Sequence, residues 1–310
     1  MIKEAYFYTI NYPVYQEDLC MMEMKYLFGI IPSLKYFLTN KNIDPSRSPF
    51  IKDRIKILYS EDSLSDISEN IVRDNLAYDD FKITFIKLLD TDIEYKERLN
   101  SIREIGWVIT GEAEMHNPKV HLALTKVNGK WIFGEYERNN YEWHIHDEKP
   151  FSYSNSLEIR VAKALVNIAI GEDLNKRLVD PCCGVGTVII EALSMDINVC
   201  GREIKETIAE NARSNVEFFG YDKETINHGN MHEIKEHYDV AIIDLPYGLF
   251  TPVTKKEQKD IMKTARRIAD KLIIVTFEDM RDDIKEAGFT IIDRCFVSKG
   301  NFMRYIDICE

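Results

Sequence analysis

The sequence predicts an α/β protein in which a mostly parallel sheet, ending in an antiparallel hairpin, follows a smaller α+β region. The chain has 310 residues, enough for two domains at roughly 100–200 residues each. After residue 157, short apolar strands alternate with amphipathic helices, which is typical of a parallel sheet covered by helices on both faces. Before residue 139, strand and helix patterns are mixed and include a hairpin around Asn128-Gly129.

The first half combines strands and helices in an order typical of an α+β domain. The elements expected there are a strand at 5–10, a helix at 14–28, strands at 51–58 and 82–89, a helix at 92–105, and strands at 120–125 and 130–136. The first helix places Leu19, Met22 and Tyr26 at helical spacing, and Gly29 stops it. The last two strands flank Asn128-Gly129, which accepts the positive φ angles of a tight turn.

Two polar stretches interrupt this pattern. Residues 61–69 are expected to form a solvated acidic face. Residues 139–150, NNYEWHIHDEKP, are polar, aromatic and aperiodic, and we expect them to connect two domains. This connector contains the ring side chains Trp143, His144 and His146. Packing between domains is favoured for them over a contact with RNA. The expected division is an α+β region at 1–138, the connector at 139–150 and a C-terminal domain at 151–310.

The second half alternates regularly between helices and apolar strands. Its first helix, at 157–170, places Val161, Leu165 and Ile168 on one face. The elements that follow are a strand at 178–180, a helix at 187–194, a strand at 198–203, a helix at 206–218, a strand at 240–244, a helix at 256–268, a strand at 271–277, a helix at 281–287, and paired strands at 290–299 and 302–308. In such sheets, ligands bind at the carboxyl ends of the strands.

Composition excludes several classes of protein. No apolar run approaches the ~18 residues of a membrane span, and the first residues do not resemble a signal peptide, so a cytoplasmic location is expected. The six cysteines include no C-x-x-C pair, which favours reduced thiols over a disulfide framework or a metal site. The net charge of −12 counts against broad nonspecific binding to nucleic acid, although a local basic patch remains compatible with it.

The first candidate site is the glycine loop Asp180-Pro-Cys-Cys-Gly184-Val-Gly186. Glycines let the backbone approach a ligand closely, and the helix N-terminus that follows favours a negative group. The loop lacks the third glycine of the G-x-G-x-x-G fingerprint and the Gly-Lys-Ser/Thr of a phosphate loop. Alone it is a weak signal, with a structural glycine turn as the alternative. Cys182 and Cys183 are interpreted as small filling side chains rather than nucleophiles.

Two further polar residues follow the next strands. Glu203 ends the second strand, where an acid can accept two hydrogen bonds from a ribose diol. A solvated glutamate at a helix start is the alternative. Asn230 follows His228-Gly229, and its amide could pair with an adenine edge, although Gly-Asn is also a common turn.

The fourth segment, Ile243-Asp244-Leu-Pro-Tyr-Gly248, ends a buried strand. Pro246 restricts Leu245 to an extended backbone, which aims its carbonyl outward. Asp244 and that carbonyl would then be two acceptors converging on one point, with Tyr247 offering a ring for stacking. This arrangement suits a planar substrate with an NH2 group, and a strand-ending turn is the alternative. The four segments in this order are hard to obtain by chance.

These motifs resemble a known family. The segments SYSNSLEIRVAKALVNIA (152–169), DPCCGVGTVIIEA (180–192) and DLPYG (244–248) are similar to the class I S-adenosylmethionine-dependent methyltransferases, which have a Rossmann-like fold. More narrowly they resemble tRNA guanine-N2-methyltransferases with an N-terminal THUMP domain. Residues 102–138 look like the end of a THUMP region, with a helix, an Asn-Pro turn and a hairpin. The resemblance is specific over 150–250 and loose over 1–95.

The resemblance implies S-adenosylmethionine as the cofactor and a role for each motif. Asp180 would lie near the methionine amino group, Glu203 at the ribose and Asn230 at the adenine. Asp244 and the Leu245 carbonyl would accept from the reacting amine. The cofactor set is Ser154, Ser156, Asp180, Pro181, Cys182, Gly184, Gly186, Thr187, Glu203, Ile204, Asn230, Met231 and Asp244, and the catalytic set is Asp244, Leu245, Pro246 and Tyr247.

The resemblance further implies methylation of the exocyclic N2 of a guanosine in tRNA, at position 10 by family resemblance. Two departures bear on substrate and rate: Leu245 replaces a proline, and Asn230 replaces an aspartate. Adenine-N6 or protein amide methylation, and a non-catalytic RNA-binding role, stay open as alternatives. Binding of a small accessory protein and formation of a homodimer also stay open. Lys299 and Arg304 flank the last hairpin, and phosphate contacts by these two side chains stay open as well.

Overall fold

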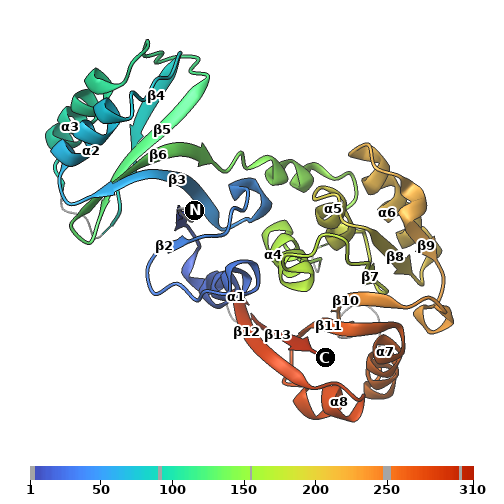
Figure 1. Cartoon of the computed structure of the whole chain (residues 1–310). Coiled ribbons are helices and arrows are strands. Elements are labelled where there is room, and N and C mark those ends of the chain that lie inside the picture. Colours follow the sequence, from blue (N-terminus) through green and yellow to red (C-terminus); the bar gives the residue numbers. More distant parts are fainter. Residues whose placement is uncertain (1–3, 90–92, 154–155, 247–252, 300–301) are drawn as a thin grey trace. The chain divides into compact units, whose positions relative to one another are not determined.

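The computed structural model describes residues 4–89, 93–153, 156–246, 253–299 and 302–310 (Figure 1). The chain divides into two compact units. The first comprises residues 1–11, 33–46 and 51–140, and the second comprises residues 12–32, 47–50 and 141–310. Two stretches of the first half therefore group with the second unit, although the sequence suggests a single division at 139–150.

The first unit is built on a six-stranded sheet with the order β2-β1-β3-β6-β5-β4. Its strands are β1 (Tyr6–Ile10), β2 (Tyr36–Thr39), β3 (Ile51–Glu61), β4 (Phe81–Phe85), β5 (Val120–Val127) and β6 (Lys130–Arg138). Only the β4–β5 pair is parallel. The turn between β5 and β6 has positive φ at Asn128 and Gly129, 50° and 85°, so the expected Asn-Gly hairpin is confirmed.

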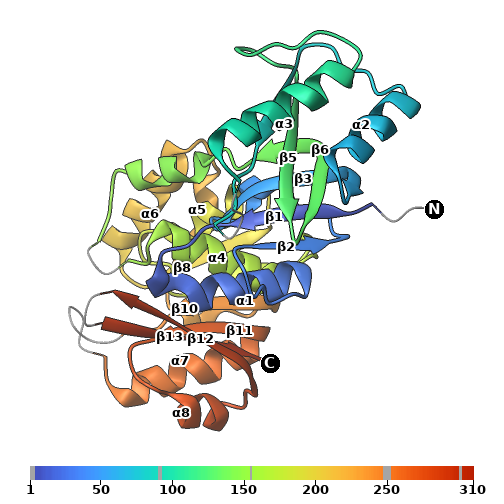
Figure 2. The same ribbon diagram turned by 90° about the vertical axis from the view of Figure 1, so that its left-hand side faces the viewer.

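Two helices, α2 (Leu64–Arg73) and α3 (Tyr95–Val108), lie side by side in the first unit (Figure 2). They bury Ile67, Ile71 and Ile105 against apolar residues of β4, β5 and β6. Asp62, Asp66 and Glu69 are exposed, so the expected solvated acidic face at 61–69 is confirmed. The isoleucines of α2 recur at helical spacing behind the N-cap Ser63 and form its opposite, buried face. The short strand β2 was not expected from the sequence.

The second unit contains a seven-stranded sheet with the order β12-β13-β11-β10-β7-β8-β9. Its strands are β7 (Leu178–Asp180), β8 (Val199–Glu203), β9 (Ile226–His228), β10 (Tyr238–Asp244), β11 (Ala269–Thr276), β12 (Ile291–Lys299) and β13 (Phe302–Cys309). The strands β11, β10, β7, β8 and β9 are parallel to their neighbours in that run, and β13 pairs antiparallel with β11 and β12. The expected mostly parallel sheet with a terminal hairpin is confirmed.

Helices cover both faces of this sheet (Figure 1). The helices of the unit are α1 (Glu17–Phe28), α4 (Ile159–Ile170), α5 (Thr187–Leu193), α6 (Glu206–Phe218), α7 (Lys255–Ile268) and α8 (Arg281–Glu286). Helices α7 and α8 pack through Ile261, Ala265 and Ile284 on the face that carries Ala241 and Ile243. Helix α4 contacts β10 and β11, and α1 packs on α4. Gly29, at φ 73°, ends α1 as expected.

Helix α4 is buried along its whole length except at Arg160. Two of its buried residues are polar, and each has partners within the second unit. Lys163 Nζ lies 3.6 Å from Glu191 Oε2 on α5. Asn167 Nδ2 donates to Glu23 Oε1 on α1 at 2.7 Å. These contacts satisfy groups that would otherwise be costly to bury, and they join α1 to α4.

The stretch expected to connect the domains contains a 3-10 helix, Glu142–Glu148, within the second unit. Trp143 and His146 are buried there, and Trp143 stacks on His144 at 3.8 Å between ring centroids. His146 Nδ1 lies 2.6 Å from Glu191 Oε1. Packing, the role favoured for these side chains from the sequence, is what the structure shows.

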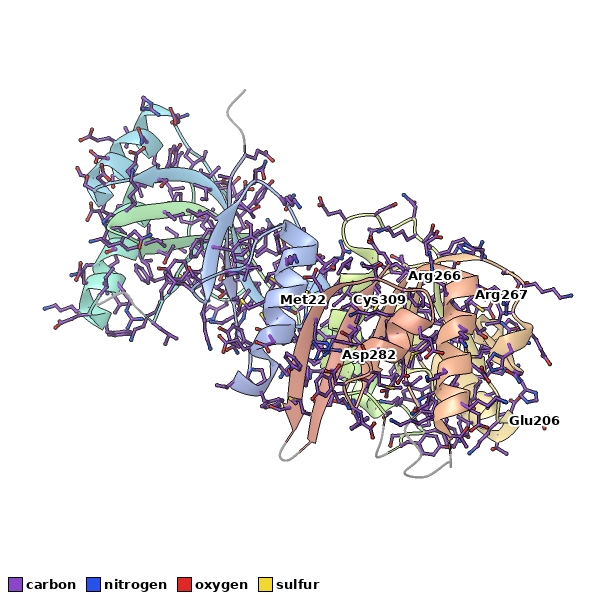
Figure 3. All side chains as sticks on the ribbon, turned by 90° about the horizontal axis from the view of Figure 1, so that it is seen from below. Met22, Glu206, Arg266, Arg267, Asp282 and Cys309 are labelled. Atoms are coloured by element: carbon purple, nitrogen blue, oxygen red, sulfur yellow. The ribbon has the colours of Figure 1, made fainter. Side chains whose placement is uncertain are left out.

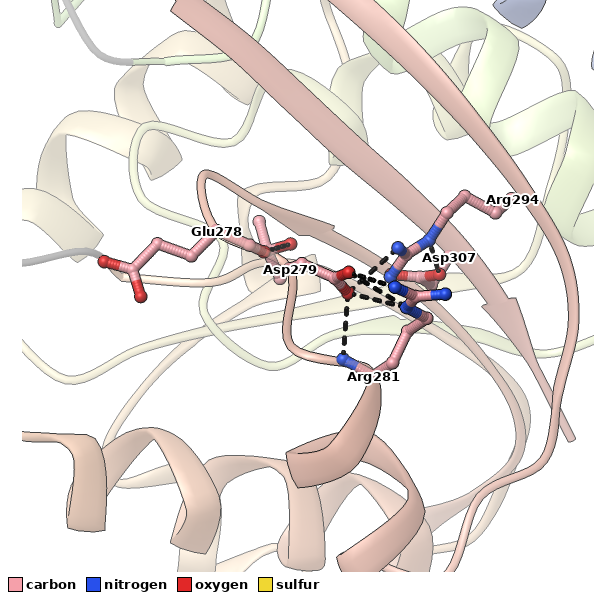
Figure 4. A network of polar contacts seen from close by, with 6 residues as sticks. Glu278, Asp279, Arg281, Arg294 and Asp307 are labelled. Atoms are coloured by element: carbon pink, nitrogen blue, oxygen red, sulfur yellow. Dashed lines mark hydrogen bonds and ion pairs between the residues drawn. The ribbon is translucent and has the colours of Figure 1, made fainter.

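A charged network holds the chain after β11 to the terminal hairpin (Figure 4). Arg294 on β12 donates from Nε and Nη2 to the two carboxylate oxygens of Asp307 on β13, at 2.6 and 2.8 Å. Its Nη1 donates to Asp279 Oδ1 at 2.9 Å, and Arg281 donates to the same carboxylate. The bidentate pair with the fully buried Asp307 fixes β12 to β13, and the Asp279 contact holds this hairpin to the chain after β11.

Two glycines of the first unit should respond in opposite ways to alanine. A Cβ on Gly134 would lie 1.9 Å from the Lys56 carbonyl oxygen across the β3–β6 pair, so Gly134→Ala should destabilise the unit by about 1–3 kcal/mol. A Cβ on Gly106, inside α3, would meet Ile83 Cδ1 at an ordinary 3.8 Å, so Gly106→Ala should stabilise it by up to about 1 kcal/mol. Urea denaturation of both variants measures the difference, and equal effects would contradict it.

Candidate active site

Three carboxylates meet at the carboxyl edge of the parallel sheet. Asp180 ends β7, Glu203 ends β8 and Asp244 ends β10. The register pairs Val240 of β10 with Leu178 of β7, so parallel strands bring these ends to one edge. The expected position of these three acids at the carboxyl ends of strands is therefore confirmed, and their roles in a site stay predictions.

The glycine loop after β7 leaves open space beside these carboxylates. Gly184 has φ 53°, and a Cβ added there would meet no atom within 4 Å. Gly186 has φ 83°, and its Cβ would lie 3.5 Å from Ala212 Cβ on α6. Both positions have the left-handed conformation that favours glycine. Gly184 thus keeps room for a ligand, and Gly186 lets α6 approach the loop.

Asp180 is buried next to this loop. Its Oδ1 accepts a hydrogen bond from the Cys182 backbone N–H at 3.1 Å. Burial, together with the nearby charges of Asp244 and Glu203, raises the pKa of Asp180 to about 8, although the hydrogen bond from Cys182 opposes the shift. A buried carboxyl group with a raised pKa favours a cationic ligand, because a nearby positive charge would stabilise the ionised carboxylate.

Glu203 is buried and bonded to the backbone through both of its oxygens. Oε2 accepts from the Gly184 N–H at 3.1 Å, and Oε1 accepts from the Lys205 N–H at 2.9 Å. Each oxygen retains a second lone pair. Glu203 therefore fixes the position of the glycine loop and stays a candidate acceptor for a ribose diol.

Asn230 caps the 3-10 helix Met231–Glu233. Its Oδ1 accepts from the His232 N–H at 3.0 Å, so the amide oxygen expected to accept from an adenine amino group already has one partner. This helix is also held by Arg267 at the end of α7 (Figure 3), which donates to the His232 and Ile234 carbonyls. Met231 is buried, with its sulfur 3.6 Å from Cys182 Sγ.

Asp244 is the acid that the sequence analysis assigns to the reacting amine. Burial raises its pKa to about 6, and the charge of Arg304 opposes that shift. Its Oδ1 is buried and has no hydrogen-bond partner among the residues that the structure describes. An acceptor in this state suits a ligand that brings an N–H group.

Arg304 reaches this edge from the terminal hairpin. Asp244 pairs with Val275 of β11, and Val275 pairs with Ile306 of β13, so the three side chains share one face of the sheet. Arg304 lies two residues before Ile306, on the same face and beyond the carboxyl end of β11. Its guanidinium carbon lies 5.1 Å from the centroid of the Phe277 ring. No motif in the sequence places this residue near Asp244.

The chain after Asp244 is fixed by two hydrogen bonds. The Leu245 N–H donates to the Val275 carbonyl at 3.0 Å, and the Leu245 side chain is buried. The Pro246 carbonyl accepts from Gln258 Nε2 on α7 at 2.8 Å, a contact that the sequence did not suggest. Tyr247 of the catalytic set and Ser154 of the cofactor set lie outside the described residues.

The remaining candidates surround the loop with varied exposure. Pro181 and Thr187 are buried, and Thr187 Oγ1 has no hydrogen-bond partner within the described part of the chain. Ile204 is 61% exposed and its side chain is available to a ligand. Ser156 donates from Oγ to the Tyr153 carbonyl at 2.8 Å. The cofactor roles of all these residues stay predictions.

The two cysteines of the glycine loop lie in an environment that disfavours the thiolate. All six are free, as expected from the sequence. Burial raises the pKa of the Cys182 and Cys183 thiols well above the ordinary value, and the neighbouring carboxylates add to the effect. Protonated thiols packed beside Met231 and Gly201 agree with their interpretation as filling side chains.

Residues 147–281 match the family described as "RMKL-like, methyltransferase domain". This segment is a methyltransferase domain. The match includes the glycine loop and the carboxylates of Asp180, Glu203 and Asp244, and S-adenosylmethionine is the cofactor of the domain. The open space at Gly184 and the unpartnered Asp244 Oδ1 fit a ligand there. The acidic donor set fits its sulfonium and ammonium charges.

Two curated relatives carry the same name, "tRNA (guanine(10)-N2)-dimethyltransferase". The one from Pyrococcus abyssi is 27% identical over 188 residues, which are 57% of this chain and 56% of that protein. The one from Methanothermobacter thermautotrophicus is 26% identical over 199 residues, 61% of this chain and 57% of that protein. The chain thus matches little more than half the length of each relative.

Among solved structures, TrmN from Thermus thermophilus is similar over 99% of both chains, with 14% identity and a TM-score of 0.49.

In the residues that the structure describes, no cluster of three or more His, Cys, Asp or Glu side chains could hold a metal ion. None of the helices in those residues has the length and hydropathy needed to cross a bilayer.

The raised pKa of Asp180 should make the ligand-free protein lose stability as pH rises. In the unfolded chain this acid ionises near its ordinary value of 3.8, whereas in the folded chain it ionises near 8. Between these values the folded state binds the extra proton, so its stabilising contribution is complete below pH 3.8 and is lost as pH rises through about 8. Melting temperatures of the unaltered protein and Asp180→Asn, compared from pH 5 to pH 8.5, test this. The variant should gain stability relative to the unaltered protein as pH rises, and a constant difference would contradict the assignment.

Arg304 should keep Asp244 ionised at neutral pH. Its positive charge lowers the pKa of Asp244, so Arg304→Met should raise that pKa above about 6 and affect Asp180 less, because Arg304 is not among the groups that shift the pKa of Asp180. Carboxyl carbon NMR titration of labelled aspartate measures both groups. Lys256→Met, which removes an α7 charge, is the control. An unchanged Asp244 titration in Arg304→Met would show that the two groups do not interact.

Proposed function

We propose that this chain is an S-adenosylmethionine-dependent RNA methyltransferase that modifies the exocyclic N2 of a guanosine in tRNA, at position 10. The methyltransferase domain and the name shared by both curated relatives support this substrate. The observation that carries the proposal is Asp244 Oδ1, a buried acceptor without a partner in the described residues. An exocyclic amine supplies the missing donor.

Guanine N2 is a weak nucleophile because its lone pair is delocalised into the ring. Asp244 and the Leu245 carbonyl would accept hydrogen bonds from its two N–H groups and favour a pyramidal nitrogen. The bond from the Leu245 N–H to Val275 and that from Gln258 to the Pro246 carbonyl fix the backbone that presents these acceptors. Holding the nitrogen in line with the methyl group would supply much of the rate.

The cofactor supplies an activated methyl group when bound. Asp180 would face its cationic methionine end, Glu203 would accept from the ribose hydroxyls, and Asn230 would contact the adenine. Asn230 Oδ1 accepts from His232 and retains a second lone pair, so the amide can pair with an adenine edge through this oxygen or through its Nδ2 donors. The target base must leave its stack to reach Asp244.

The first unit is proposed to supply affinity for tRNA, as a THUMP-like region. Its mixed sheet and two helices form an α+β architecture. We also propose a cytoplasmic location, since the six free cysteines agree with a reducing compartment.

Transfer of labelled methyl groups to unmodified tRNA transcripts tests the proposed reaction. Nuclease digestion should yield N2-methylguanosine or its dimethyl form, and a transcript with adenosine at position 10 should take up no label. Asp244→Ala should lower turnover by at least about a hundredfold, because the reacting amine loses an acceptor that aligns it.

The same Asp244→Ala variant should bind S-adenosylmethionine with affinity close to that of the unaltered protein, measured by calorimetry. Turnover equal to the unaltered protein would remove Asp244 from the reaction. Cofactor binding without label in any tRNA would retain the methyltransferase and reject the substrate.

A further inference from the structure

We infer that Asn215 on α6 is a positioning residue for the cofactor, because its buried amide bonds the glycine loop to the chain segment that leads into α4. The inference rests on the proposed function only in taking S-adenosylmethionine as the ligand. None of the four motifs in the sequence contains this residue.

The amide of Asn215 uses both of its N–H donors and its oxygen on two backbone segments. Oδ1 accepts from the Phe151 N–H at 2.9 Å, and Nδ2 donates to the Phe151 carbonyl at 2.8 Å. The second N–H donates to the Val185 carbonyl at 2.9 Å. Asn215 itself has no exposed surface, so water does not compete for these bonds.

The Val185 contact places the effect at the ligand. Val185 lies between Gly184, where a Cβ would meet open space, and Gly186, where a Cβ would lie 3.5 Å from Ala212 Cβ. Ala212 and Asn215 are three residues apart on α6 and so share one face of the helix. One helix face therefore supports the loop through a close packing contact and a hydrogen bond.

The Phe151 contact ties a second element to the same amide. Phe151 begins the stretch that includes Ser156, a candidate cofactor residue, and continues into α4 at Ile159. Asn215 bonds both the N–H and the carbonyl of Phe151, as a residue of a neighbouring strand does in a hydrogen-bonded pair. Because a single amide joins both segments, a shift of one relative to the other breaks at least one bond.

Only asparagine provides this combination at the position. An aspartate could accept from Phe151 but could not donate to either carbonyl, and a serine hydroxyl could donate to only one. Loss of the donors leaves the carbonyl of the buried Val185 without this partner and releases the Phe151 carbonyl. The loop would then relax, and a ligand that needs its fixed shape would bind less tightly.

Calorimetric titration of the full chain with S-adenosylmethionine, without RNA, is the test. Asn215→Ala should weaken affinity by at least about tenfold, or about 1.4 kcal/mol. Asn167→Ala is the matched control, since Asn167 is also fully buried in the second unit and makes three hydrogen bonds, to Glu23 and Arg47. This control lies away from the carboxyl edge of the sheet. The backbone carbonyl of its α4 neighbour Ile168 accepts a hydrogen bond from Lys271, which is near the start of β11 and so at the opposite edge.

Both variants should lower the melting temperature, but only Asn215→Ala should change cofactor affinity. Equal affinities in Asn215→Ala and the unaltered protein, or equal losses in both variants, would overturn the inference and leave the proposed function standing. Absence of binding by the unaltered protein would overturn both. If Asn215→Ala does not fold, Asn215→Ser keeps one donor and should show a smaller loss, and unchanged affinity there would reject the role.

A kinetic measurement separates positioning from catalysis. With tRNA as substrate, the KM for S-adenosylmethionine should rise in Asn215→Ala, while kcat at saturating cofactor stays within about threefold. A fall in kcat with an unchanged KM would place Asn215 in the chemical step and contradict a positioning role.

Discussion

The second unit depends on the complete burial of helix α4. A parallel sheet with two apolar faces needs helices on both, and α4 is itself apolar around its circumference, so it needs cover on its outer side as well. Helix α1 supplies that cover from a distant part of the sequence. The buried Lys163 and Asn167 make the fit specific, because each needs its partner, Glu191 or Glu23, in place. A fragment that begins at residue 151 would lack α1 and leave this side of α4 uncovered.

The carboxyl edge of the sheet concentrates negative charge where there is little solvent. Asp180 and Asp244 both have raised pKa values because burial disfavours their ionised forms. The fold thus maintains an electrostatic arrangement that is unfavourable by itself and that a cationic ligand relieves. Arg304 offsets this at Asp244 alone, so the two acids differ in their titration although they lie on neighbouring strands.

The sequence predicted the parts of the fold that follow from local pattern. The alternation of apolar strands and amphipathic helices located the parallel sheet, and the four motifs placed Asp180, Glu203 and Asp244 at its carboxyl edge. The elements it did not predict depend on tertiary contacts. The packing of α1 on α4 cannot be read from helical spacing, because an apolar face does not identify its partner. Asn215 and Arg304 belong to a helix and a hairpin whose local sequences carry no site motif, and only the fold brings them to the glycine loop and to Asp244.

The order of the last three strands has a consequence for synthesis of the chain. Strand β13 inserts between β11 and β12, although it follows both in sequence. Until β13 has left the ribosome, the apolar strand β11 has an unpaired edge, which is a template for intermolecular strand pairing. The hairpin therefore also closes the sheet against aggregation in the nascent protein. The same late event delivers Arg304, so the edge of the sheet becomes protected and the active site becomes complete in one step.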